Sequence, residues 1–95
     1  MDIQKNIVIC ELYDLYAQFL SEKQREILYK RYFLDMSFGE IAENSSRQAV
    51  NDSLKRAVSK LEAFEDKLHL RKIMRITNDE NLTPEEKIEQ IKSMI

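Results

Sequence analysis

A single glycine, Gly39, and a single proline, Pro84, occur in the 95 residues of this chain. These two residue types form tight turns and interrupt helices, so a chain that almost lacks them has few places for hairpins. Its abundant Leu, Glu, Lys, Gln and Arg residues favour helix. We therefore expect an all-α fold, and the length allows one small domain with a modest core.

The first three helices are predicted from apolar spacing and from capping residues. Ser21 with Gln24 forms a capping-box pattern that begins a second helix, and Ser37 with Glu40 begins a short third one. The second helix is expected to end near Asp35. Before it, apolar residues three to five positions apart predict one buried face: Ile3, Ile7 or Val8, Leu12, Leu15, Phe19 and Leu20. Six aromatic residues at helical spacing are more typical of core packing than of base stacking: Tyr13, Tyr16, Phe19, Tyr29, Tyr32 and Phe33.

A long fourth helix is expected from Arg47 to about Arg75, because no Gly or Pro interrupts this stretch and Ser45 or Ser46 can cap it. At about 1.5 Å per residue it would extend some 40 Å, longer than a domain of this size covers. Its second half then needs another element or another copy of the chain. Its inward positions recur every three or four residues: Val50, Leu54, Ala57 or Val58, Leu61, Phe64 and Leu68.

Three regions follow from this pattern. Residues 1–75 form the helical domain with its extended fourth helix, and residues 76–82 form a linker. Residues 83–95 form a last helix, because Thr83, Pro84 and Glu86 occupy the N-cap, first and third positions of a capping box. This helix carries a narrow stripe of Ile88, Ile91 and Ile95, which needs a partner in cis or across a homodimer.

The stretch "FGEIAENSSRQAV" indicates a helix-turn-helix, in which a short helix supports a second one whose first turns enter the DNA major groove. Arg47 suits guanine, and Gln48 and Asn51 suit adenine. Lys55 and Arg56, one turn later, suit phosphates. An ordinary capped helix with polar residues at its exposed start explains the same stretch equally well.

The charge distribution is uneven. The chain carries −2 overall, with a pI near 5.4, yet residues 44–75 hold eight basic and four acidic side chains. A basic middle is compatible with nucleic-acid contact through one face, whereas the acidic whole argues against strong nonspecific DNA binding.

Several function classes find no support. Cys10 is the only cysteine, so an internal disulfide is excluded, and with no signal-peptide pattern at the N-terminus a cytoplasmic protein is expected. No apolar stretch is long enough for a membrane span. His69 has no companion ligands for a metal, and no phosphate loop or nucleophile with a base is present. We expect neither an enzyme nor a cofactor nor a small-molecule substrate.

A family resemblance adds to these patterns. "LYDLYAQFLSEKQREILYKRYFLDMSFGEIAE", "SRQAVNDSLKRA" and "LEAFEDKLHL" together resemble the YlxM family of small bacterial proteins, over roughly residues 10–72. The centre is similar to the fourth region of bacterial sigma factors. The resemblance implies double-stranded DNA binding and, from the neighbourhood of the family's genes, a regulatory role in the signal recognition particle pathway.

Carried over residue by residue, the resemblance places the support helix at 38–43 and begins the recognition helix at Ser46. Family members often have Tyr where Asn51 stands. The candidate DNA-binding residues are Ser46, Arg47, Gln48, Asn51, Lys55 and Arg56.

The turn departs from the family pattern, being two residues short at Asn44 and Ser45. Eight positions separate Ala42 from Val50, where the family has ten, and the absent residues include apolar ones that pin the helices together. Either the natural chain carries further residues here, which an intact mass would reveal, or a tightened turn tilts the recognition helix. In the second case, each apolar side chain that is absent would remove about 1.5 to 3 kcal/mol of burial free energy.

Two other functions remain open on the sequence. One is a helical adaptor that binds a signal recognition particle component or another protein through its long helix. The other is RNA contact through the basic stretch from Lys67 to Arg75.

Overall fold

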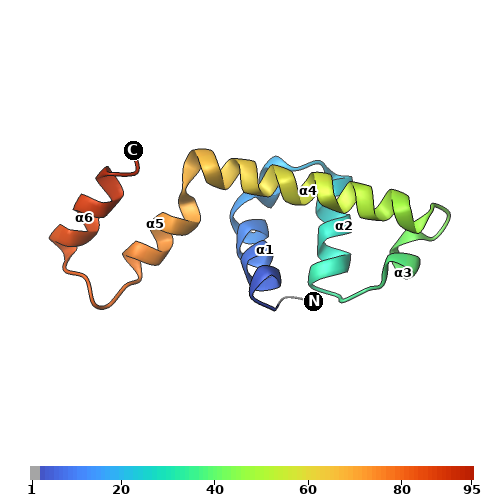
Figure 1. The fold of residues 1–95 in the computed structure, drawn as a ribbon, viewed down its shortest axis with the longest axis horizontal. Coiled ribbons are helices and arrows are strands. Elements are labelled where there is room, and N and C mark those ends of the chain that lie inside the picture. The colour runs from blue at the N-terminus through green and yellow to red at the C-terminus, as the bar shows by residue number, and fades with distance from the viewer. Residues whose placement is uncertain (1–2) are drawn as a thin grey trace.

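α4 (Arg47–Leu68) is the longest helix, and the others are arranged around it (Figure 1). The computed structural model describes residues 3–95. α1 (Ile3–Tyr16) and α2 (Glu22–Tyr32), joined through a 3-10 turn, cross one side of α4, and α3 (Phe38–Ala42) lies beside its N-terminal end. The described residues contain only helices and connections, so the all-α prediction is confirmed.

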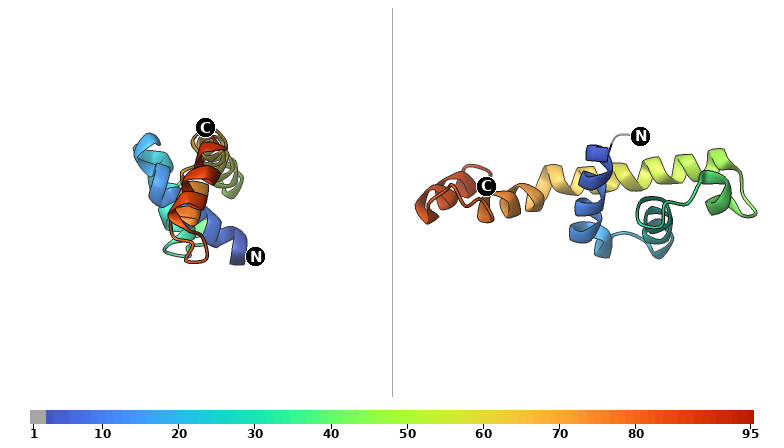
Figure 2. Two further views of the ribbon diagram at one scale, coloured as in Figure 1. Left: turned by 90° about the vertical axis from the view of Figure 1, so that its left-hand side faces the viewer. Right: turned by 90° about the horizontal axis from the view of Figure 1, so that it is seen from below.

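α5 (Leu70–Thr77) and α6 (Pro84–Lys92) form a hairpin beyond the C-terminal end of α4. The described chain is therefore elongated, with extents of 54 × 22 × 17 Å (Figure 2). No helix among residues 3–95 is both long enough and apolar enough to cross a membrane.

Capping boxes begin three of the helices, as predicted. In the first, Ser21 Oγ accepts a hydrogen bond from the Gln24 N–H at 3.1 Å, and Gln24 Oε1 accepts from the Ser21 N–H at 3.2 Å. Such reciprocal bonds satisfy backbone donors that the first turn of a helix leaves free. The same arrangement starts α3 and α6, at the pairs Ser37–Glu40 and Thr83–Glu86.

The core lies between α4 and the three helices before it. α4 contributes one face with the predicted spacing. The largest fully buried side chains of the core are Tyr16, Leu28 and Leu61. Among residues 3–95, the buried side chains of the core are Ile9, Leu12, Tyr16, Leu20, Leu28, Ala42, Val50, Leu54, Ala57 and Leu61.

The buried face predicted for the first segment was wrong in part. Ile3, Ile7 and Phe19 are mostly exposed, whereas Ile9, Leu12 and Tyr16 face α4. Apolar residues occur all around α1, so spacing alone does not select the face that meets α4.

The prediction of one helix from Arg47 to about Arg75 was also wrong. α4 ends at Leu68, His69 adopts the left-handed conformation (φ 57°, ψ 26°), and α5 begins at Leu70. The break is held by side chains that replace helical carbonyls as acceptors. The Leu70 N–H donates to the Tyr16 hydroxyl at 3.1 Å, and the Arg71 N–H donates to Glu65 Oε1 at 3.0 Å.

α5 therefore belongs to the C-terminal hairpin rather than to an extended fourth helix. It continues to Thr77, two residues into the region predicted as linker, and α6 begins at Pro84. Lys87 Nζ donates to the Thr77 carbonyl at 2.7 Å and ties the two helices together.

Candidate nucleic-acid interface

α3 and the start of α4 form the helix pair of a helix-turn-helix. α3 lies beside the N-terminal end of α4 (Figure 1), and Ala42 of α3 and Val50 of α4 are both buried. Its capping box lowers the pKa of Glu40, because the Ser37 backbone N–H donates to the carboxylate. Five residues are too few for a helix that is stable alone. Packing on α4 and the capping box therefore hold α3 in place.

The connection between α3 and α4 is unusually tight. Glu43 has φ 47° and ψ −99°, a conformation that residues with a side chain rarely adopt and that costs of order 1–3 kcal/mol. Ser45 holds the turn, because its N–H and its hydroxyl both donate to the Ala42 carbonyl, at 2.7 and 2.8 Å. The chain then reaches Ser46, the N-cap of α4, without an apolar residue.

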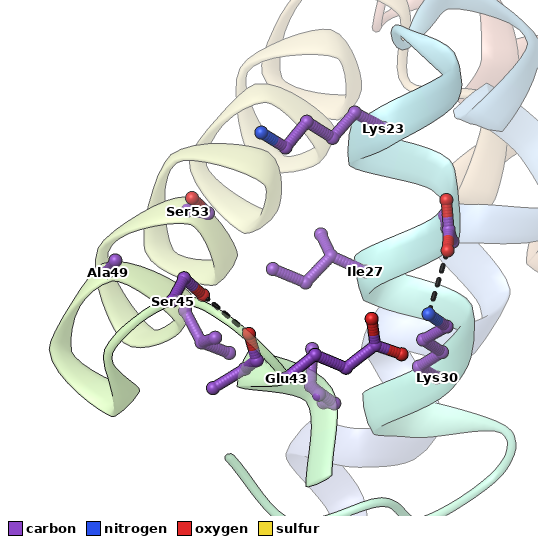
Figure 3. Close-up of a pocket in the computed structure, with 11 residues that line it drawn as sticks. Lys23, Ile27, Lys30, Glu43, Ser45, Ala49 and Ser53 are labelled. Carbon is purple, nitrogen blue, oxygen red and sulfur yellow. Dashed lines mark hydrogen bonds and ion pairs between the residues drawn. The ribbon is translucent and has the colours of Figure 1, made fainter. Parts of the chain in front are cut away.

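A pocket of about 280 Å³ lies behind this turn, between α2 and the start of α4 (Figure 3). Its floor is apolar and is formed by Ile27, Ile41, Ala42, Ala49 and Val50. Asn44 and Ser45 are exposed and do not fill it with apolar atoms. The pocket therefore has room for an apolar side chain from the turn between α3 and α4.

One cation that lines this pocket, Lys30, is held in an ion pair. Lys30 Nζ lies 2.7 Å from Glu26 Oε1, and this bond raises the pKa of Lys30 and lowers that of Glu26 (Figure 3). Lys30 is therefore partly neutralised as a site for an anionic ligand.

The first three candidate residues have different surroundings. Ser46 is the N-cap of α4, and its hydroxyl accepts from the Ala49 N–H at 3.0 Å. The Arg47 guanidinium lies against Gly39 of α3, so closely that a Cβ on Gly39 would be 3.2 Å from Nε. Gln48 is exposed, one position further along the helix.

The other three candidates divide between two flanks of α4. Asn51 and Lys55 line a groove of about 440 Å³ that also receives Lys5 from α1 and Arg31 from α2. Arg56 lines a smaller pocket on the other flank, next to the N-terminal end of α2. The structure therefore does not bring all six candidates to one surface.

Lys5 and Arg31 are cations that the sequence reading missed. Their helices pack on α4 from one side, and only that packing brings the two residues to the groove containing Lys55. Arg31 is held in place, because its Nη1 donates to the Met36 carbonyl at 3.0 Å and its guanidinium lies 4.9 Å from the Phe38 ring centre. Glu62 at the end of the same groove opposes this positive charge.

An acidic residue also lies on the outward face of α4. Asp52 is exposed and follows Gln48 by four positions, so it lies one turn away on the same face. Its carboxylate repels phosphate. The sequence already contained this signal, since helical spacing alone places Asp52 between Gln48 and Arg56.

No residues in the described part of the chain are arranged as a metal site. Among residues 3–95, no group of three His, Cys, Asp or Glu side chains is placed to hold an ion. His69 is at the junction of α4 and α5, and its Nδ1 is buried without a hydrogen-bond partner there.

The family that this chain matches agrees with the helix-turn-helix geometry of α3 and α4. Residues 3–94 match the model of the family UPF0122, described as "Putative helix-turn-helix protein, YlxM / p13 like". A UPF0122 protein of Limosilactobacillus reuteri (strain DSM 20016) is 45% identical over 82 residues, covering 84% of this chain and 73% of that protein. The corresponding protein of Thermoanaerobacter sp. (strain X514) is 56% identical over 61 residues, 62% of this chain and 52% of its own length.

A third relative, from Pediococcus pentosaceus, is 47% identical over 72 residues, which are 74% of this chain and 64% of that protein. The matched region thus spans half to three quarters of these bacterial relatives. Because the family match covers nearly the whole described chain, the resemblance drawn from the sequence is confirmed. This chain belongs to the UPF0122 family of YlxM- and p13-like helix-turn-helix proteins.

Proposed function

We propose that this protein is a sequence-selective, double-stranded DNA-binding regulator without catalytic activity. The observation that carries the proposal is the exposed start of α4, held by α3 in a helix-turn-helix and flanked by a groove with Lys5, Arg31 and Lys55. A helix presented in this way fits the major groove of DNA.

The proposed division of labour follows the surroundings of each side chain. Gln48 is exposed, and Asn51 lies one turn later at the groove, so these two amides read adenine edges. Arg47 reads guanine after leaving its position against Gly39. Lys5, Arg31 and Lys55 contact phosphates, which position the protein without reading sequence.

The tight turn and Asp52 predict modest affinity. Glu43 and Ser45 fix the entry of α4, so the recognition helix cannot tilt freely. Asp52 opposes the phosphate attraction supplied by Lys55. Specificity would then come mainly from base contacts, and a second copy binding a second half-site would add affinity.

Selection from random duplex DNA with the purified chain tests the proposal. A recovered motif is expected to bind wild-type protein with an affinity that falls with added salt. Arg47→Ala together with Gln48→Ala should abolish the preference for the motif and leave helicity unchanged. Lys92→Ala, an exposed cation at the end of α6, serves as the control. An unchanged gel shift for the double variant would refute base reading by α4.

A role in the signal recognition particle pathway and a cytoplasmic location belong to the same proposal. They rest on the YlxM resemblance, and the helix-turn-helix family match supports only the DNA-binding part. A regulator of this kind would act as a homodimer, the form in which helix-turn-helix proteins meet paired half-sites.

The second candidate is a helical adaptor for a protein partner. It is favoured by one specific observation, the apolar surface of the C-terminal hairpin, where Met74, Ile88 and Ile95 are exposed. Salt dependence distinguishes the two functions. DNA binding through several phosphates weakens steeply with salt, whereas an apolar helix interface does not.

A further inference from the structure

The α5–α6 hairpin has apolar side chains that the described residues leave exposed. None of its side chains is buried, and Met74, Ile88 and Ile95 are 49%, 54% and 97% exposed. α6 packs on α5, and no other described helix approaches it as closely. Helices of eight and nine residues are marginal in water without packing. A stable hairpin therefore needs a cover over its exposed apolar side chains.

A receptive surface lies beside the hairpin. α1 and α5 enclose a groove of about 390 Å³, in which Leu15 and Met74 supply the apolar part. Arg75 and Asp14 also line it, so the groove offers charges of both signs. Arg71 is already paired, with its Nε 2.9 Å from Glu11 Oε2, and this bond joins the hairpin to α1.

The hairpin is divided into a basic and an acidic part. α5 contains Arg71, Lys72 and Arg75 and no acidic residue, giving +3. Residues 78–95 contain five acidic and two basic side chains, giving −3. The hairpin as a whole is neutral, so a uniformly acidic or basic partner would match one part and be repelled by the other. A second hairpin, related by a two-fold axis, matches both.

We propose that the α5–α6 hairpin is the surface on which a second copy of this chain docks. α6 of each copy lies along α5 of the other, its acidic part facing the other's basic helix. Ile88 and Ile95 cover Leu15 and Met74 of the partner groove. This deepens the homodimer included in the proposed function, rests on that part alone, and is independent of DNA as the ligand.

Analytical ultracentrifugation of the full chain tests the surface. Wild-type protein should sediment at twice its 11.3 kDa chain mass. Ile88→Asp should raise the dimer dissociation constant by about tenfold or more, because a charge replaces a covered apolar group. The matched control is Ile7→Asp on α1, at a side chain of nearly equal exposure (53%), which should leave the dimer intact. Wild-type protein at the mass of one chain at every concentration, or equal dissociation by both variants, would overturn the proposal.

Charge exchange supplies a second test, and its expected outcome, recovery of the dimer on mixing, cannot arise from a loss of hairpin stability. One variant carries Lys72→Glu and Arg75→Glu, and the other carries Glu85→Lys and Glu89→Lys; all four side chains are exposed. Each variant alone should be shifted towards monomer. An equimolar mixture should form the heterodimer, because each hairpin then faces opposite charge at both contacts. A mixture that stays monomeric, or single variants that dimerise like wild type, contradicts the reciprocal arrangement. Neither result depends on whether a DNA motif is found.

Discussion

The Tyr16 hydroxyl donates a hydrogen bond of 2.6 Å to Glu65 Oε1, joining residues 49 positions apart at the ends of α1 and α4. The same two side chains accept the free N–H groups at the start of α5, from Leu70, Arg71 and Lys72. A core tyrosine and a carboxylate thus act together as the cap of α5. The direction of the whole C-terminal hairpin depends on this pair.

Tyr16→Phe should lower the free energy of unfolding by about 1–3 kcal/mol, measured by urea denaturation. The substitution leaves the Leu70 N–H without its acceptor and Glu65 without one donor, and unsatisfied buried groups cost about that much. Tyr13→Phe is the matched control, because the ring stays in its aromatic cluster with Phe33 and no hydrogen bond of its hydroxyl is found in the described chain. Equal effects of the two substitutions would contradict the capping role.

The Tyr16–Glu65 pair should also make the fold sensitive to alkali. Burial, followed by the hydrogen bond to Glu65, raises the pKa of Tyr16 from its ordinary value of 10 to about 12. A group whose pKa is higher in the folded state stabilises the fold below its unfolded pKa and loses that contribution as pH rises through the folded one. Stability should therefore fall between pH 10 and 12, by up to about 3 kcal/mol.

Denaturation at a series of alkaline pH values measures this loss. Tyr16→Phe, which cannot ionise, should show a shallower decline than wild type over the same range. The remaining slope includes Tyr32, whose pKa is also raised by burial. If wild type and Tyr16→Phe lose stability in parallel, Tyr16 is not the group responsible.

Local signals in the sequence predicted much of the fold, whereas features that depend on tertiary contacts could not be predicted from it. The capping boxes at Ser21, Ser37 and Thr83 are local, since each donor and acceptor lie within four residues. The interactions that end α4 are not local, because they involve Tyr16, which is far away in the sequence. Nothing near His69 signals a break, since neither Gly nor Pro is present to favour one.

The same distinction applies to the candidate interface. Periodicity placed Arg47, Gln48 and Asn51 at the start of a helix, which the structure has. It could not show that Lys55 lines the groove while its neighbour Arg56 lines the pocket on the other flank. Nor could it show that Lys5 also lines the groove. Those relationships arise from how α1 and α2 pack against α4.

His69→Gly should stabilise the protein by about 1 kcal/mol. His69 occupies a left-handed conformation at the end of α4, where a side chain costs about 1–2 kcal/mol and glycine is the usual residue. The change also removes a buried Nδ1 that has no partner in the described chain. His69→Val should be destabilising, because a branched Cβ suits this conformation worst. Thermal unfolding of both variants checks the order, and a less stable glycine variant would refute the explanation.

Lengthening the turn should fill the pocket behind it. Inserting Leu-Ser between Asn44 and Ser45 provides an apolar side chain for the floor of Ile27, Ile41 and Val50, and allows Glu43 to leave its strained conformation. The expected gain is about 1.5 to 3 kcal/mol, the value of burying one such side chain. Insertion of Ser-Ser is the control, since it relaxes the turn without filling the pocket. Two insertions of equal stability would show that the leucine remains outside.

Lys55 and Arg56 provide the sharpest test of which flank of α4 faces DNA. Lys55 shares its groove with Lys5 and Arg31, so Lys55→Ala should weaken binding to the selected duplex and reduce the slope of log affinity against log salt by about one. Arg56→Ala, the same loss of charge on the other flank, should change the slope less. Lys5→Ala should behave like Lys55→Ala, because phosphate contacts from one groove act on the same strand. A larger slope change for Arg56→Ala than for either lysine would move the interface to the flank of α4 where Arg56 lies, next to the N-terminal end of α2.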